Sequence, residues 1–190
     1  DRSRGLGDVY KRQAIGDVLA TVGIAKLISK KAPNVWKASQ LTLDKNHSLE
    51  LIKKEKLFCT NEYFYGRSRP YVQTFVCQHP QYQWPLCFDL KHDPSPYLKM
   101  PILELTAAMK KQPKFIRTLR HNKHPVIMNP SYADKFEEYK MIGITKLESR
   151  AKMIKSSKDF ADKIISIKRS EIEEKEQTKS QEDLYNEESI

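Results

Sequence analysis

The residues best suited to binding chemistry lie in one run between Lys110 and Met128. Six basic side chains occur there without a single acidic one: Lys110, Lys111, Lys114, Arg117, Arg120 and Lys123. Apolar residues stand between these charges, and a strand would place alternating positions on opposite faces. Neither face would be purely apolar, which indicates a strand partly buried and partly turned toward an anionic partner. A solvated edge strand whose lysines block pairing explains the run equally well.

The positive charge is concentrated in the middle of the chain. The net charge of the 190 residues is +10, to which residues 36–147 contribute +8, residues 1–35 +4 and residues 148–190 −2. Positive charge on the part expected to fold indicates a polyanionic partner. This pattern favours nucleic acid over a membrane surface as that partner. The length suits one domain, or one domain with pieces of its neighbours.

The residue pattern disfavours several other kinds of site and location. No run of about 18 apolar residues and no signal-peptide pattern occurs, so we expect a cytoplasmic protein without a membrane partner. The three cysteines form no Cys-x-x-Cys motif and cannot all pair, which favours free thiols. A zinc site is not expected, because the spacing matches no known ligand pattern for Cys77, His79, Cys87, His92, His121 and His124.

The first elements that must position these residues are helical. Residues 14–31 carry apolar side chains at helical spacing, and two lysines close the last turn, where cations complement the helix dipole. Pro33 should end this helix, because the residue before a proline avoids the α conformation. Asp17 lies near the start, where an acidic residue commonly complements the dipole. Residues 34–56 predict a second, weaker helical region.

The pattern then changes to strands. Aromatic and β-branched residues fill 57–66, 71–78 and 84–90, with turn residues between them. Residues 66–70 are expected to form the first hairpin loop, and residues 79–82 the next turn.

The later elements complete an α+β pattern. Residues 101–111 predict a short helix with proline at its first position, and strands are expected at 114–120 and 125–128. Four or five short strands with one inserted helix suggest a small antiparallel β-barrel. From Glu148 the chain is helical and highly charged, with a candidate apolar stripe at Met153, Ile154, Phe160, Ile164, Ile165 and Ile167. Residues 170–190 carry a net charge of −6 and are expected to be disordered.

The first 13 residues are expected to lie outside the natural sequence. Residues 8–13, DVYKRQ, match the in-frame translation of a transposon-end oligonucleotide used in sequencing libraries, and the segment has no hydrophobic period. We therefore expect residues 1–13 to be a library-adapter scar and the natural sequence to begin at Ala14, inside a longer gene.

With these pieces placed, residues 14–185 resemble the exodeoxyribonuclease I family, bacterial DEDD-type enzymes that degrade single-stranded DNA from the 3′ end. Ala14 and Asp17 fit the family's last catalytic motif, His-x-Ala-x-x-Asp, whose histidine position falls on Arg12. The resemblance continues through Ala25-Lys26-Leu27, Pro33, His79-Pro80, Phe88-Asp89-Leu90, His121-Asn122-Lys123-x-Pro125 and residues 182–186. These motifs are modest singly and fairly specific in this order.

The resemblance implies a domain order and a chemistry. It makes residues 14–33 the last helix of an exonuclease domain, 34–147 an SH3-like DNA-binding domain and 148–190 the start of a helical domain, truncated at both ends. The family uses two metal ions, usually Mg²⁺, held by four carboxylates, and only Asp17 corresponds to one of these catalytic, metal-binding residues. This chain alone is therefore expected to be inactive.

The resemblance also gives the basic residues a partner, single-stranded DNA. Single-strand binders combine a positive groove with aromatic faces. The favoured DNA-binding charges are Lys56, Arg67, Arg69, Arg117, Arg120 and Lys123. Possible stacking residues are Tyr63, Phe64, Tyr65, Tyr71 and Phe75, although core packing is the commoner role for such rings.

Other partners and functions follow less directly. The family docks the acidic tail of single-stranded DNA-binding protein, and a monomer is expected. Two alternatives to a nuclease fragment stay open. One is a non-catalytic nucleic-acid-binding barrel, and the other is an SH3-like module that binds acidic peptides.

Overall fold

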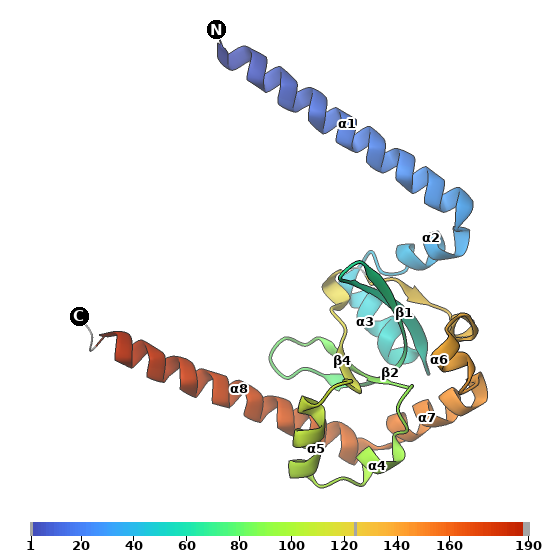
Figure 1. Cartoon of the computed structure of the whole chain (residues 1–190), viewed down its shortest axis with the longest axis vertical. Coiled ribbons are helices and arrows are strands. Elements are labelled where there is room, and N and C mark those ends of the chain that lie inside the picture. Colours follow the sequence, from blue (N-terminus) through green and yellow to red (C-terminus); the bar gives the residue numbers. More distant parts are fainter. Residues whose placement is uncertain (1, 124, 188–190) are drawn as a thin grey trace.

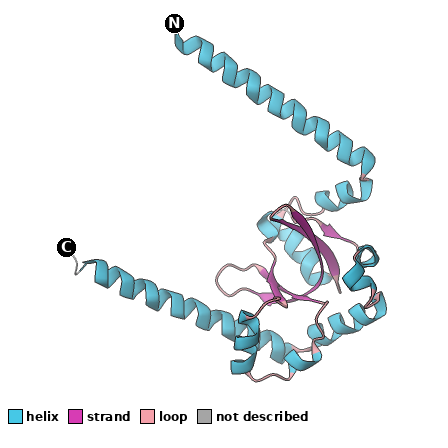
Figure 2. Ribbon diagram, viewed as in Figure 1, coloured by secondary structure: helices cyan, strands magenta, loops and turns pink. Residues whose placement is uncertain are grey.

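Five antiparallel strands form the sheet of the computed structural model, which describes the backbone of residues 2–123 and 125–187 and the side chains of residues 13–63, 65–123 and 125–178. The strands are β1 (Phe58–Phe64), β2 (Arg67–Gln78), β3 (Pro85–Asp89), β4 (Ile116–Thr118) and β5 (Ile127–Met128). Their order is β4-β3-β2-β1-β5, so β4 and β5 are the edges of an open sheet. The α+β class and the antiparallel strands are confirmed (Figure 2), whereas these pairings leave closure into an SH3-like barrel unconfirmed.

Helices precede, interrupt and follow the sheet (Figure 1). They are α1 (Arg2–Lys31), α2 (Pro33–Gln40), α3 (Lys45–Lys54), α4 (Ser95–Leu98), α5 (Ile102–Lys110), α6 (Glu137–Lys140), α7 (Ile144–Ser156) and α8 (Lys158–Glu187). Two 3₁₀ turns, η1 (His121–Lys123) and η2 (Pro130–Lys135), flank β5. None of the helices in the described ranges is long and apolar enough to cross a bilayer. The predicted helix at 101–111 is confirmed, with Pro101 at the cap position rather than inside the helix.

Helix α1 projects away from the sheet (Figure 1). It begins at Arg2. The backbone of residues 2–13, which were expected to lie outside the natural sequence, therefore forms one continuous helix with the segment predicted from residue 14. Its end at Lys31 confirms the break predicted before Pro33. Its large apolar side chains are exposed: Ile15, Val18, Leu19, Val22, Ile24, Leu27 and Ile28.

The first hairpin turns earlier than the sequence suggested. Tyr65 and Gly66 have φ values of 49° and 75°, and Phe64 pairs directly with Arg67 across the turn. Positive φ at both central residues is the signature of a tight hairpin turn, and Gly adopts it without strain. The predicted loop over residues 66–70 is therefore wrong, because residues 67–70 belong to β2. Pro70 is tolerated there because β2 pairs only with β1 at this point.

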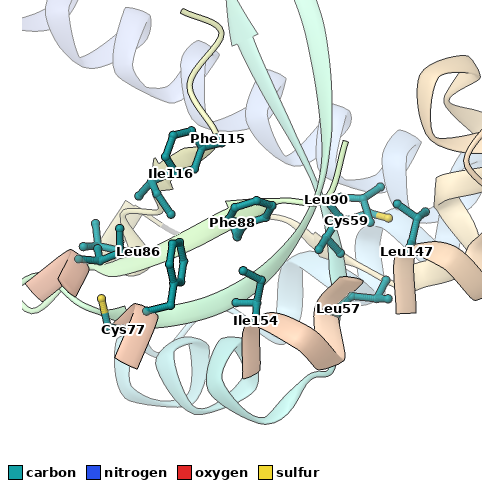
Figure 3. Close-up of a cluster of buried hydrophobic side chains, with 14 of the residues drawn as sticks. Leu57, Cys59, Cys77, Leu86, Phe88, Leu90, Phe115, Ile116, Leu147 and Ile154 are labelled. Carbon is teal, nitrogen blue, oxygen red and sulfur yellow. The ribbon is translucent and has the colours of Figure 1, made fainter. Parts of the chain in front are cut away.

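Both faces of the sheet are covered by apolar packing. On one face Ile52 of α3 packs with Phe58, Cys87, Leu119 and Ile127. On the other, strand residues such as Leu86 and Phe88 pack against Leu147 and Ile154 of α7 (Figure 3). Each large apolar side chain removed from water contributes about 1.5–3 kcal/mol, so this core couples the sheet to its helices.

The start of α8 belongs to the same core. Phe160, Ile164 and Ile167 are buried, which confirms most of the predicted apolar stripe. The packing is thus continuous across residue 148, where the sequence suggested a domain boundary. Beyond residue 170 the helix continues to Glu187, where disorder was expected. Glu, Lys and Gln dominate this stretch and favour helix even without burial.

Candidate nucleic-acid interface

A groove of about 750 Å³ lies where β4, the loop between β2 and β3, and α8 meet. Its lining includes two acidic residues, Glu62 and Glu171, and six basic ones: Lys114, Arg117, Arg120, Lys123, Lys168 and Lys175. The lining therefore carries a net charge of +4. A concave surface with this balance concentrates anions from solution. The basic run at residues 110–128 supplies four of the six cations, and α8 supplies the other two.

Arg117 is held by partners within the protein. Its Nη2 lies 2.5 Å from Oε2 of Glu62, and its guanidinium carbon lies 3.5 Å from the centre of the Tyr71 ring. The Arg117 side chain is only 19% exposed. An ion pair and a cation–π contact already occupy this guanidinium. Arg117 therefore forms part of the groove wall and is not a free ligand for a phosphate.

Other cations in the groove are more available. Arg120, Lys123, Lys114 and Lys175 are exposed, and no ion pair to them is found among the side chains that the structure describes. The guanidinium carbon of Arg120 lies 5.0 Å from the Trp84 ring centre. Lys168 differs from these, because it pairs with Glu171 at 2.7 Å.

An aromatic cluster lines the same groove on the β2–β3 loop. The rings of Tyr82 and Trp84 are stacked with centroids 4.6 Å apart, and His79 lies 4.9 Å from Tyr82. The sequence pattern predicted a turn at residues 79–82 and a strand from Trp84, so it did not bring the two rings together. An aromatic pair at positions i and i+2 also fits the period of a strand, so no sequence signal marked these two rings as a binding site.

Histidines beside the groove add little positive charge at neutral pH. Burial, and then the charge of Lys168, lower the pKa of His79. Burial, and then Lys45 and Lys53, lower the pKa of His121 in η1. The groove's charge therefore comes from its lysines and arginines.

Three predicted DNA-binding residues lie outside this groove. Lys56 pairs with Glu148 of α7 at 3.0 Å. Arg67 is exposed near the β1–β2 turn, and Arg69 lines a separate depression of about 340 Å³ beside α6. Of the six residues proposed from sequence, the structure brings together Arg117, Arg120 and Lys123 alone.

The predicted stacking residues are dispersed. Tyr63 and Tyr65 are exposed on the β1–β2 hairpin, at 74% and 101%. Tyr71 is buried beneath Arg117, and Phe75 packs in the α3-side core. The Phe64 side chain lies outside the described residues. None of the four described rings lines the groove.

Asp17 stands on the exposed part of α1, without a metal-binding neighbourhood. In the ranges that the structure describes, no group of three or more His, Cys, Asp and Glu side chains could hold a metal ion. One carboxylate on a helix surface cannot hold two divalent ions, so the described residues do not fit the two-metal site that the resemblance implies. Arg12, at the family's histidine position, has a side chain outside the described residues.

No protein-family model and no curated protein matches the chain. Solved structures do. Exonuclease I from Methylocaldum szegediense matches with a TM-score of 0.63 and 20% identity, over 80% of this chain and 36% of that one. E. coli exonuclease I in complex with a dA16 oligonucleotide gives 0.61 and 18%, with the same coverages of 80% and 36%. The zinc-bound E. coli exonuclease I–ssDNA complex gives 0.59 and 18%, again over 80% and 36%.

These matches agree with the family resemblance drawn from the sequence motifs. The identities are low, so the likeness concerns the course of the backbone, and the chain spans about a third of the length of the proteins that it matches. Over 80% of its length, the chain therefore shares the backbone fold of 36% of the exonuclease I chain.

Proposed function

We propose that this chain is part of a 3′→5′ single-stranded DNA exonuclease of the exodeoxyribonuclease I type, and that it contributes a surface that binds the DNA strand. The observation that carries the proposal is the groove of net charge +4 between β4 and α8. Its free cations stand beside aromatic rings, a combination typical of proteins that bind single strands without sequence preference. The fold matches to exonuclease I structures that hold oligonucleotides support the same assignment.

The cations of the groove have a defined role in this proposal. Arg120 and Lys123 neutralise phosphates, while Arg117 fixes the wall beside them through Glu62 and Tyr71. Phosphate contacts position a strand without reading its sequence. Hydrolysis itself needs two metal ions, usually Mg²⁺, and we assign only the Asp17 position to that chemistry.

Fluorescence anisotropy of a labelled oligo-dT across a salt series tests the binding. Each phosphate contact on a single strand contributes a slope of about −0.7 in log K against log salt, so Arg120→Ala with Lys123→Ala should remove about 1.4 units of slope. The matched control is Lys110→Ala with Lys111→Ala. It removes the same charge from exposed residues of the same run that do not line the groove. Equal slopes for both double variants would contradict the groove as the binding surface.

The same assay separates the alternative partner. The resemblance implies docking of the acidic tail of single-stranded DNA-binding protein. An acidic peptide of this kind would bind the same basic side chains of the groove as DNA. In a competition titration, we expect single-stranded DNA to displace an acidic peptide from the groove at lower concentration than the reverse. Stronger binding of the peptide would favour a peptide-binding module.

A further inference from the structure

The loop between β2 and β3 holds its aromatic rings in a fixed arrangement. The His79 amide donates to the Trp84 carbonyl at 2.8 Å, and the Gln83 amide donates to the His79 carbonyl at 2.9 Å. The side chain of Gln83 donates to the Pro80 carbonyl at 3.0 Å. Gln83 adopts a positive φ of 57° within this closed turn. The rings are therefore placed by the hydrogen bonds of the loop itself, which reduces the ordering cost of binding.

These rings are not part of the protein's interior. Neither Tyr82 nor Trp84 belongs to either buried cluster of the described residues, and Tyr82 is 52% exposed. Trp84 is half-buried. Aromatic rings that stack on each other at the surface of a charged groove suit a flat ligand. Cations line the same groove: Arg120 lies between β4 and η1, Lys123 belongs to η1 and Lys175 to α8.

The arrangement of Arg120 shows where such a ligand would enter. Its guanidinium carbon is 5.0 Å from the Trp84 ring centre, compared with 3.5 Å for Arg117 over Tyr71. Arg120 is also exposed, so it covers the indole loosely. A planar group that stacks on Trp84 can replace this contact and leave the guanidinium free for a neighbouring anion.

We propose that the Tyr82–Trp84 pair is a stacking site for one unpaired nucleobase of the strand that the groove binds. The base takes the place of the Arg120 guanidinium over Trp84, and Arg120 turns to the phosphate of the same nucleotide. This inference rests on the proposed single-strand binding of the groove and adds a base contact to it. Every base has a flat π face, so the site tolerates all four bases.

Trp84 can report on the contact directly. The chain has two tryptophans, Trp36 and Trp84, so Trp36→Phe leaves a single indole as the probe. We expect an oligo-dT of about 12 nucleotides to quench the fluorescence of Trp84 in this variant, because stacked bases quench indole emission. A uniformly abasic strand of the same length supplies the phosphates without bases and should leave the emission unchanged.

Affinity measurements by anisotropy complete the test with the full chain. Trp84→Ala should weaken oligo-dT binding about tenfold, or about 1.4 kcal/mol, with the salt slope unchanged because no charge is removed. Trp84→Phe keeps a ring and should recover most of the affinity. On the abasic strand, the parent and Trp84→Ala should bind equally.

The outcomes are distinguishable. If neither strand binds with a salt-dependent slope, the proposed function fails and this inference fails with it. If both strands bind with that slope but Trp84→Ala matches the parent on oligo-dT, while circular dichroism shows both proteins folded, only the stacking site is overturned. A loss on oligo-dT that Trp84→Phe does not recover, with an equal loss on the abasic strand, would also overturn it.

Discussion

The guanidinium of Arg117 lies over the ring of Tyr71, with 3.5 Å between the guanidinium carbon and the ring centre. Glu62, on the strand next to Tyr71, holds the same guanidinium by an ion pair. The acid and the arginine are 22% and 19% exposed, so the pair is shielded from most of the solvent. One charge of the basic run is thus used to fasten β4 to the β1–β2 hairpin, although β4 pairs only with β3.

Arg117→Ala should lower the free energy of unfolding by roughly 1–3 kcal/mol, because it leaves the Glu62 carboxylate without its cation and uncovers the Tyr71 ring. Arg120→Ala is the matched control. It removes an exposed arginine three residues along and should change stability by less than about 0.5 kcal/mol. Urea denaturation of the three proteins measures the difference. Similar stability losses in both variants would show that the pairing with Glu62 contributes nothing.

Tyr139→Phe should destabilise the chain by about 1–3 kcal/mol. The Tyr139 hydroxyl donates to Oδ1 of Asp89 at 2.7 Å, and both residues are about 1% exposed. Without the hydroxyl, the buried carboxylate of Asp89 loses a donor that water cannot replace. Tyr132→Phe serves as the control, since no hydrogen bond from its hydroxyl is found among the described residues. Thermal melts with equal midpoints for the two variants would contradict this role of Tyr139.

The three thiols should be unreactive in the folded chain. Burial raises the pKa of Cys59 and Cys77 to about 12 from an ordinary 9.0, and it raises the pKa of Cys87 as well. The thiolate is the reactive form, so a thiol reagent at about pH 8 should modify the native chain far more slowly than the urea-unfolded chain. Rapid native labelling would show that the core opens readily.

The raised thiol pKa values also set an alkaline limit to stability. Unfolded thiols lose their protons near pH 9.0, whereas folded Cys59 and Cys77 keep theirs to about pH 12. Stability from these groups is therefore complete below the unfolded pKa and is lost as the pH rises toward the folded one. Urea midpoints measured below pH 9.0 and at about pH 10.5 should fall less in Cys77→Ala than in the parent. An equal fall would assign the alkaline loss to other groups.

The 190-residue chain should not cleave DNA. Among the described side chains Asp17 belongs to no group of three or more possible metal ligands, and a two-metal mechanism requires several carboxylates around one water. Incubation with 3′-labelled single-stranded DNA and Mg²⁺ should release no nucleotide above background. Mg²⁺-dependent release that disappears in Asp17→Ala would overturn the expectation, whereas release unaffected by that change would identify a contaminating nuclease.

Local patterns predicted the elements well, because they depend on residues close in sequence. The change from helical to alternating periodicity near residue 57, the helix at 101–111 and the apolar stripe from Ile154 to Ile167 all lie where the sequence placed them. The hairpin was displaced, because Pro70 suggested a loop. That proline is acceptable in β2, where no second neighbour requires its missing N–H.

The candidate site was only half predictable, because a groove joins residues that are distant in the chain. The run from Lys114 to Lys123 was visible as a cluster of charge, whereas Lys168 and Lys175 come from a helix that begins 35 residues later. Likewise, Glu62 cannot be recognised as the partner of Arg117 until β1 and β4 are placed in one sheet. Tyr82 and Trp84 were not predicted as a site, because the expected turn at 79–82 and strand at 84–90 separated them and their stacking arises only in the folded loop.

The single-sided pairing around Pro70 has a consequence for motion. Between Asn61 and Pro70, β1 and β2 pair only with each other and form a two-stranded arm. Isolated two-stranded hairpins are marginally stable in water, so amide protons of this arm should exchange with deuterium ahead of those in the fully buried β3. Arg67 and Arg69 lie on this two-stranded arm, so holding them against a ligand would cost conformational entropy of the chain. The backbone beside Arg120 and Lys123 is held by hydrogen bonds from Leu119 to Pro85 and from Lys123 to Arg120, so these cations offer a binding strand the smaller entropic penalty.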